Sequence, residues 1–367
     1  MKFSPQDEEF MQQALRLARR GIGQTSPNPA VGAVVVRAGK VIGQGWHRQA
    51  GGPHAEILAL SHLRARGATL YVTLEPCCTH GRTPPCTAAI IAAGIRRVVV
   101  AAKDPNPRHD GHGLAVLRRA GIRCDSGLLA DEATRLNSSF NHWITTGQPL
   151  VTAKLALSLD GKFTTQTGDS QWITSATARG EAHKLRSRSD AIMVGSGTVI
   201  TDNPRLTLRH DVRGSRPGRD KRQPWRVVID ARGRCPRSAH LFTDPHRHRT
   251  IVGTTPQSPA AWRRALALAG VTVLVLPAQQ RQIHLSGLLA ELGRMEITSL
   301  LVEGGGELHR AFFSAGLVDH IAFFFAPKII GGAQTMQTAV NVTGHWRRIG
   351  RDEMLFEGCL SASANSI

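Results

Sequence analysis

The sequence predicts an α/β protein of two domains. Strand-like apolar runs alternate with helical patterns along most of the 367 residues, which is the arrangement that builds partly parallel sheets covered by helices. The segment Gly147-Gln148-Pro149 closes one helical pattern and precedes a new apolar strand. We therefore expect one domain over residues 1–147 and a second over residues 148–367.

The composition indicates a globular protein without a membrane segment. The hydrophobic content is 41%, and no run reaches the roughly 18 apolar residues that a membrane-spanning helix needs. The first residues carry an amphipathic helical pattern rather than a signal peptide. The six cysteines show no disulfide framework, so we expect reduced thiols and a cytoplasmic protein.

The charge allows two interpretations. A net charge of +19 is typical of proteins that bind nucleic acid. The arginines are nevertheless spread along the chain, and their one cluster, residues 205–226, is rich in glycine and proline, as a solvated loop would be. We therefore expect no nucleic-acid partner, although the same surface would attract phosphorylated small molecules.

The first domain is expected to begin with a helix and a hairpin. Residues 6–20 place their apolar side chains on one helical face. Residues 33–36 and 41–43 flank a polar, glycine-containing turn, which is the pattern of a β-hairpin. The remaining elements expected here are strands over 69–74, 97–102 and 122–124 and helices over 87–93, 114–120 and 131–144.

Asn28 stands between two prolines ahead of the hairpin. Its amide could contact a base edge, or the residue could serve only to form a turn, and alone the two interpretations are about equal. The metal motif described next favours substrate contact.

Three residues of the first domain have the pattern of a zinc site. One imidazole and two thiolates, from His54, Cys77 and Cys86, suit a tetrahedral Zn²⁺ whose fourth position stays open for water. Pro53 and Pro85 each precede a ligand and a helical run, so we expect His54 and Cys86 in the first turns of two helices. Zn²⁺ lowers the pKa of bound water to about 7 and so supplies a nucleophile at neutral pH.

Glu56 is the expected proton carrier beside this metal. Zinc deaminases of nucleobases share the signature H-x-E followed by P-C-x-x-C, whereas eight residues separate the two cysteines here. Cys78 competes with Cys77 for the ligand role, and we favour Cys77 because it follows a proline directly. A closed structural site in a binding module is the alternative, with Cys78 or His80 as the fourth ligand.

The second domain again alternates strands with helices. Its expected strands cover residues 150–157, 190–194, 226–229, 250–252, 271–276, 299–302 and 320–326. Helices are expected between them, notably over 176–188 and 260–269.

Two glycine-rich turns of this domain follow strands. Gly195-Ser196-Gly197-Thr198 and Glu303-Gly304-Gly305-Gly306-Glu307 can each offer backbone N–H groups to an anion. Neither matches the G-x-G-x-x-G of a classical dinucleotide-binding domain, and a tight turn explains most such runs. Two of them in one domain nevertheless favour a phosphate-bearing cofactor, and neighbouring arginines favour NADP over NAD.

Over essentially its whole length the chain resembles the bifunctional riboflavin-biosynthesis family that joins a pyrimidine deaminase to a reductase. The matching segments are residues 28–32, His54-Ala55-Glu56, Glu75-Pro76-Cys77, residues 81–86, 103–107, 158–161, 170–174 and 202–207, and Val302-Glu303-Gly304-Gly305. The long spacing between the two cysteines is this family's own variant.

The resemblance implies a cytidine-deaminase-like α/β/α domain followed by a dihydrofolate-reductase-like α/β domain. It implies zinc-dependent deamination of 2,5-diamino-6-ribosylamino-4(3H)-pyrimidinone 5′-phosphate, then NADPH-dependent reduction of the ribosyl group to give 5-amino-6-ribitylamino-uracil 5′-phosphate. One Zn²⁺ per chain and NADPH are the implied cofactors. We also expect a homo-oligomer.

The resemblance also carries site residues across. The positions that would face NADP are Ala156, Trp172, Thr198, Asp202, Gly305, Gly306, Glu307, Leu308, His309, Arg310 and Ala311. The positions that would face substrate are Ser170, Arg186, Leu206, Arg209 and Glu303, in addition to Asn28 from the argument above, and Lys154 and Asp160 are polar groups expected beside the sugar. From the residues alone, Trp172 could equally be core and Arg186 a solvated helix face.

One departure and one rival interpretation remain. The family often has a small polar residue after the strand that ends at Asp230, and Ala231 cannot offer NADP a side-chain hydrogen bond.

The rival is a nucleic-acid deaminase, acting on tRNA, with an accessory domain. It predicts a basic tract along the loop between the cysteines, where the sequence offers mainly His80 and Arg82.

Overall fold

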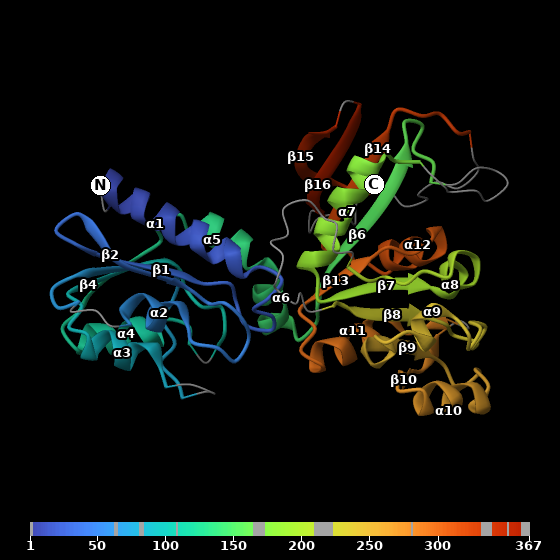
Figure 1. Cartoon of the computed structure of the whole chain (residues 1–367), viewed down its shortest axis with the longest axis horizontal. Helices are drawn as coiled ribbons and strands as arrows, with labels where there is room; N and C mark the ends of the chain where they lie inside the picture. Colours follow the sequence, from blue (N-terminus) through green and yellow to red (C-terminus); the bar gives the residue numbers. More distant parts are fainter. Residues whose placement is uncertain are drawn as a thin grey trace. The chain divides into compact units, whose positions relative to one another are not determined.

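Two sheets organise the chain, one in each of two units, Met1–Gly147 and Gln148–Ile367 (Figure 1). The computed structural model describes residues 3–61, 65–80, 84–107, 109–163, 173–208, 223–279, 282–331, 340–350 and 352–360. Each unit carries its own apolar cores. The expected α/β fold class is confirmed.

The sheet of the first unit has the strand order β2-β1-β3-β4-β5. Its strands are β1 (Gly32–Arg37), β2 (Lys40–Trp46), β3 (Thr69–Leu74), β4 (Arg97–Ala102) and β5 (Arg123–Ser126). β1 and β2 form the expected antiparallel hairpin, and its turn places Ala38 and Gly39 at φ values of 50° and 74°. β3, β4 and β5 run parallel, so their carboxyl ends lie at one edge of the sheet.

Helices cover both faces of this sheet. α1 (Pro5–Ala18) and α5 (Ala130–Leu136) lie on one face, and α2 (Ala55–Leu60), α3 (Cys86–Ala92) and α4 (His112–Arg119) lie on the other (Figure 1). α1 begins where Ser4 and Asp7 form a reciprocal capping box, and a short 3₁₀ turn, η1 (Arg19–Gly21), follows it. The expected three-layer α/β/α arrangement is thus confirmed.

The helix expected over residues 131–144 is wrong in one respect, because the chain breaks it at Asn137. α5 ends at Leu136, and α6 (Ser138–Thr146) begins after Asn137. The buried amide of Asn137 accepts a hydrogen bond from the backbone N–H of Ala30 at 2.8 Å and donates to its carbonyl at 3.0 Å. A helical pattern does not reveal such a distant partner, because it records only spacing along the chain.

The second unit contains a nine-stranded sheet of order β10-β9-β8-β7-β13-β6-β14-β16-β15. Its strands are β6 (Leu150–Ser158), β7 (Ala191–Gly195), β8 (Trp225–Ile229), β9 (Thr250–Thr254), β10 (Thr272–Val275), β13 (Ser299–Val302), β14 (His320–Ala326), β15 (Val342–Ile349) and β16 (Glu353–Leu360). The strands from β10 to β14 in this order are parallel, and β16 and β15 are antiparallel. A separate two-stranded ribbon joins β11 (Ala278–Gln279) to β12 (Gln282–Ile283).

Alternating side chains of these parallel strands pack into two apolar cores, one on each face of the sheet. Ala191 and Met193 of β7 pack with α11 (Leu285–Arg294) and α12 (Gly306–Ser314). Ile192 and Val194 pack on the other face, which carries α8 (Ser196–Asp202), α9 (His240–Thr243) and α10 (Ala260–Leu268). α7 (Ala176–Arg188) covers β14 and β16, and a 3₁₀ turn, η2 (Arg247–Arg249), precedes β9.

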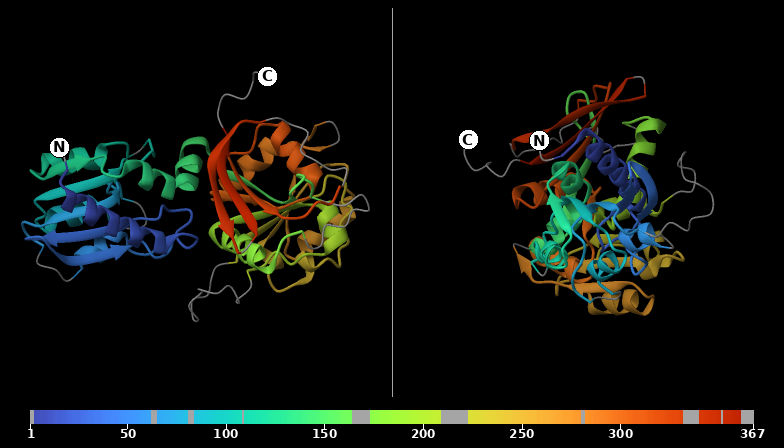
Figure 2. Two further views of the ribbon diagram at one scale, coloured as in Figure 1. Left: turned by 90° about the horizontal axis from the view of Figure 1, so that it is seen from above. Right: turned by 90° about the vertical axis from the view of Figure 1, so that its left-hand side faces the viewer.

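The strands β15 and β16 were not expected from the sequence. They form a hairpin beyond β14, drawn in red in Figure 2. Every residue of β15 except Ile349 is exposed, so the strand lacks the alternation of apolar and polar residues that marks a half-buried strand.

Within the described residues, no helix is long and apolar enough to span a bilayer.

Candidate functional site

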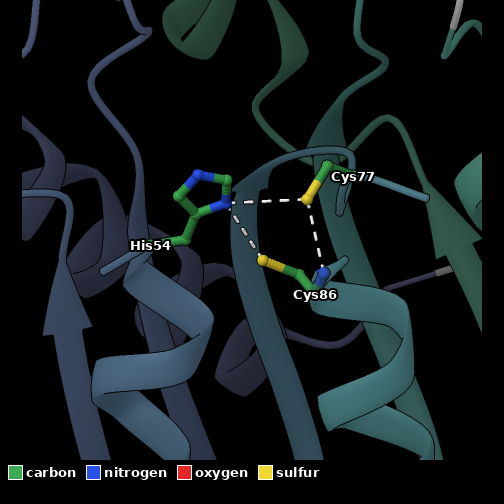
Figure 3. Close-up of side chains that lie close together, drawn as sticks. All are labelled: His54, Cys77 and Cys86. Carbon is green, nitrogen blue, oxygen red and sulfur yellow. Dashed lines mark hydrogen bonds between the residues drawn. The ribbon is translucent and has the colours of Figure 1, made fainter. Parts of the chain in front are cut away.

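His54, Cys77 and Cys86 converge from three elements of the first unit, as Figure 3 shows. His54 is the N-cap of α2, Cys77 follows β3, and Cys86 is the first residue of α3 after the N-cap Pro85. Both expected helix starts are therefore confirmed. The prolines help to fix these positions, because the proline ring restricts the backbone φ angle to a value that suits the start of a helix.

The distances between the ligand atoms fit a zinc ion. Nδ1 of His54 lies 3.6 Å from Sγ of Cys77 and 3.1 Å from Sγ of Cys86, and all three ligand atoms lie within 4.8 Å of one another. Zinc–sulfur and zinc–nitrogen bonds of about 2.3 and 2.1 Å in a tetrahedron separate such atoms by about 3.5–3.8 Å. The donor set and its spacing therefore suit Zn²⁺ held by three protein ligands.

Cys77 accepts hydrogen bonds from Cys86. The backbone N–H of Cys86 donates to Sγ of Cys77 at 3.3 Å, and the Cys86 thiol also donates to it. The hydrogen bond from the Cys86 thiol, with that N–H and His54, lowers the pKa of Cys77 to about 4, and the same contact raises the pKa of Cys86. Cys77 is thus prepared as a thiolate, which is the form that binds zinc.

Glu56 lies in the first turn of α2, two residues after His54, and its side chain is buried. Burial raises the pKa of this carboxyl to about 7. A group with a pKa near the working pH can both accept and return a proton. The position and the environment of Glu56 therefore suit a proton carrier next to the metal ligands.

A fourth protein ligand is not found among the described residues. Cys78, the competing ligand, points its Sγ toward Nδ1 of His109 at 3.8 Å instead of toward the metal ligands. In the described part of the chain, His54, Cys77 and Cys86 are the only group of His, Cys, Asp and Glu side chains spaced to hold an ion. This arrangement leaves a coordination position for water and argues against a closed structural site.

Asn28 is tied to this site through His47. The Asn28 amide nitrogen lies 3.2 Å from Nε2 of His47, and Nδ1 of His47 lies 3.1 Å from the carbonyl of Pro53, the residue before His54. The rings of His47 and His54 meet edge to face, with centroids 5.5 Å apart. His47 thus links Asn28 to the segment that carries His54, and no sequence motif indicated this residue.

A pocket of about 400 Å³ lies at the carboxyl ends of the parallel strands in the second unit. Both glycine-rich turns line it, at the starts of α8 and α12, and Ile229, Ala231, Arg234, Gln282, Ile283 and Leu285 complete it. A Cβ added to Gly195 or Gly197 would meet no atom within 4 Å, and one added to Gly305 would come only to 3.9 Å from Thr198. The backbone therefore faces open space that a bulky ligand can enter.

Seven of the positions expected to face NADP line this pocket. They are Thr198, Asp202, Gly305, Gly306, Glu307, Leu308 and Ala311. Ala156, His309 and Arg310 are not among its lining residues within the described chain, and the His309 ring is buried with Nδ1 3.3 Å from the carbonyl of Gly305. Trp172, Ser170 and Arg209 lie outside the described residues.

The substrate positions Arg186 and Glu303 contact each other. Nε and one terminal nitrogen of the Arg186 guanidinium each donate to a different oxygen of Glu303 at 2.7 Å, in a bidentate pair that joins α7 to the turn after β13. Although burial alone would raise it, the charge of Arg186 lowers the pKa of Glu303 to about 2. Lys154 of β6 interacts electrostatically with Glu303, and burial lowers the pKa of this lysine.

Two further expected residues have visible structural roles. Leu206 is buried in the core with α8, α9 and α10, at a φ of 51°. Asp160 accepts hydrogen bonds from the Ser158 hydroxyl at 2.6 Å and from the backbone N–H of Gly331 at 3.0 Å, so it holds a turn.

The chain matches two family models in succession. Residues 4–102 match the cytidine and deoxycytidylate deaminase zinc-binding region, and residues 149–351 match the RibD C-terminal domain. The riboflavin biosynthesis protein RibD of Aquifex aeolicus is 46% identical over 327 residues, which are 89% of this chain and 88% of that protein.

Solved structures of the same family superpose on almost the whole chain. The RibD of Acinetobacter baumannii has a TM-score of 0.86 and 36% identity and covers 97% of this chain and 99% of its own. A diaminohydroxyphosphoribosylaminopyrimidine deaminase/5-amino-6-(5-phosphoribosylamino)uracil reductase from Thermotoga maritima has a TM-score of 0.82 and 34% identity, with the same coverage of 97% and 99%. The chain therefore belongs to the RibD family of riboflavin biosynthesis proteins, in which a zinc-dependent deaminase is joined to an NADPH-dependent reductase.

Proposed function

We propose that the chain deaminates 2,5-diamino-6-ribosylamino-4(3H)-pyrimidinone 5′-phosphate and then reduces the product to 5-amino-6-ribitylamino-uracil 5′-phosphate. Residues 1–147 carry the first reaction and residues 148–367 the second. The observation that carries the proposal is the open three-ligand cluster beside the buried Glu56, together with a glycine-lined pocket in the other unit.

In the deaminase unit, His54, Cys77 and Cys86 hold the zinc. When bound there, Zn²⁺ lowers the pKa of its water, so that hydroxide is available at neutral pH. Glu56 takes a proton from that water and delivers it to the departing amino group, which leaves as ammonia while a ring carbonyl forms. Asn28, positioned by His47, contacts an edge of the pyrimidine.

In the reductase unit, the two glycine-rich turns would hold the cofactor. Bound NADPH would supply a hydride for C1′ of the ribosyl group; the bond from C1′ to the ring oxygen would break, and that oxygen would take up a proton to become a hydroxyl of the ribityl chain. Thr198 and Asp202, with the turn from Gly305 to Ala311, would hold the cofactor, and the backbone N–H groups at the N-terminus of α12 would suit its phosphates. Glu303 and Arg186 face the substrate from the end of β13 and from α7.

Trp172, Ser170 and Arg209 belong to the same proposal by resemblance to the family. The same resemblance assigns further positions to the reductase site, namely Ala156, Leu206, Leu308, His309 and Arg310. We further propose a cytoplasmic homo-oligomer.

The test is incubation of the purified chain with the diaminopyrimidine ribotide, followed by mass spectrometry. Replacing an amino group by oxygen should raise the mass by about one unit without NADPH, and hydride transfer should add about two more with it. An unchanged substrate mass in the presence of stoichiometric zinc and NADPH would contradict the proposal.

The tRNA deaminase alternative lacks support in the second unit. It assigns no task to residues 148–367, although residues 149–351 match a reductase family model. Release of ammonia from tRNA, but not from the ribotide, would favour it.

A further inference from the structure

Two arginines of the first unit stack on one tryptophan. The guanidinium carbons of Arg20 and Arg48 lie 5.1 and 4.9 Å from the centre of the Trp46 ring. The two positive charges are therefore at most about 10 Å apart, which is about one Debye length at ordinary ionic strength. Trp46 packs against the core on the α1 face of the sheet, so its ring is a fixed surface for two planar guanidinium groups.

No carboxylate neutralises this pair. Within the described residues, Arg20 and Arg48 are exposed and neither forms an ion pair, whereas the neighbouring Arg19 is paired with Glu132. The stretch 10–55 contains no aspartate or glutamate, although it holds five arginines and one lysine. Two like charges held close together without a counter-charge favour the binding of an anion, and the guanidinium fork matches phosphate oxygens in particular.

The arginine pair borders the deaminase site on the side of His47. Arg48 follows His47 in the chain. Gly21, the residue after Arg20, lies so close to His47 that an added Cβ would come within 2.7 Å of the His47 carbonyl oxygen. The His47 ring in turn meets the ring of His54 edge to face, with centroids 5.5 Å apart. Chain connectivity and packing thus place both arginines next to the segment that carries a metal ligand.

The size of the proposed substrate matches this placement. Its one phosphate is at the 5′ position of the ribosyl group, about nine bonds from the pyrimidine carbon that loses its amino group, and so about 10 Å away. Arg48 begins about 3.8 Å along the chain from His47, and its long side chain extends farther. A phosphate at the arginine pair is therefore compatible with a pyrimidine at the metal ligands.

We propose that Arg20 and Arg48 bind the 5′-phosphate of the pyrimidine ribotide at the deaminase site, and that they make this unit prefer the ribotide to the dephosphorylated riboside. This inference rests on the proposed deaminase function. Stacking on Trp46 restricts both side chains before the substrate binds, so less conformational freedom is lost on binding. The phosphate also offsets the repulsion between the two guanidinium charges.

The test is the steady-state rate of ammonia release by the full zinc-loaded chain, without NADPH, from the ribotide and from the riboside. For Arg20→Gln and for Arg48→Gln, we expect the KM of the ribotide to rise about 5- to 30-fold, while the KM of the riboside changes less than about twofold. The double variant should have nearly equal KM values for the two substrates. In the wild type, raising the salt concentration from about 50 to about 300 mM should increase the KM of the ribotide only.

Two further variants complete the design. Arg119→Gln removes the same charge from an exposed position in the last turn of α4 and is the matched control, so it should leave both KM values unchanged. Arg48→Lys keeps the charge without the fork and should recover part of the ribotide preference, which covers the case in which a glutamine variant does not fold.

Three results would overturn the assignment: an unchanged KM of the ribotide in the double variant, a parallel rise of both KM values, or a wild type that does not distinguish the ribotide from the riboside. The parallel rise would show a purely structural role for the arginines. Failure of the wild-type chain to release ammonia from either substrate would instead refute the deaminase function itself.

Discussion

Replacing Arg186 by methionine should destabilise the second unit by leaving a buried carboxylate without its partner. The Arg186–Glu303 pair is bidentate, and only 5% of the Glu303 side chain is exposed. Its pKa falls from 4.5 to about 2, and at about 1.4 kcal/mol for each pKa unit this corresponds to about 3 kcal/mol. Measured losses on breaking one partner of a buried ion pair are about 3–5 kcal/mol, which agrees.

Hydrogen exchange read by mass spectrometry on peptides from β13 and β6 reports the opening free energy of this unit separately from the first. At pH 7 we expect Arg186→Met to lower it by about 3 kcal/mol. The double variant Arg186→Met/Glu303→Gln should recover part of the loss because the unpaired charge is gone. The exposed pair Arg294–Glu291 is the control, and Arg294→Met should cost less than about 1 kcal/mol.

The pH dependence provides a further check. Because the folded pKa of Glu303 is lowered, its contribution to stability is present above pH 4.5 and is lost as the pH falls toward 2. The difference between the wild type and Arg186→Met should therefore shrink over that window. A double variant no more stable than Arg186→Met, or a difference independent of pH, would refute the reasoning.

Three further predictions concern the first unit and the glycines. Glu56→Gln should keep one zinc per chain by elemental analysis and lose about 10²- to 10⁴-fold in ammonia release, whereas a fall in zinc content would show that Glu56 is a ligand. Cys77→Ala should lose zinc and Cys78→Ala should keep it, and the opposite pattern would reassign the ligand. Gly32→Ala places a Cβ 2.0 Å from a backbone carbonyl oxygen of α1 and should lower the Tm or prevent folding. A Cβ at Gly180 would meet no atom within 4 Å, so Gly180→Ala should raise the Tm of the second unit or leave it unchanged.

The sequence predicted the parts of the fold that local patterns determine. The first helix, the hairpin turn at Gly39 and the helix starts at His54 and Cys86 all depend on neighbours within a few residues. The zinc ligands were predictable for the same reason, because each stands at a marked helix start or strand end.

Features that depend on distant contacts were not predictable. The break at Asn137 depends on the backbone of Ala30, more than a hundred residues away. In the hairpin β15–β16, Gly344 lies opposite Gly358, and a Cβ on Gly344 would come within 2.3 Å of the carbonyl of Glu357. The two strands therefore pair through a close approach of their backbones at these glycines, and no alternation of apolar residues marks β15 in the sequence. His47 belongs to no motif, because only the fold brings it between Asn28 and Pro53.

The central claim is that the two units carry two separate reactions. The most direct measurement supplies Glu56→Gln, in separate assays, with the diaminopyrimidine ribotide and with the already deaminated ribosylaminouracil phosphate, each with NADPH. We expect about 10²- to 10⁴-fold slower ammonia release from the first compound and oxidation of NADPH at the wild-type rate with the second. Wild-type ammonia release, or loss of reduction together with deamination in a folded, zinc-loaded variant, would contradict it.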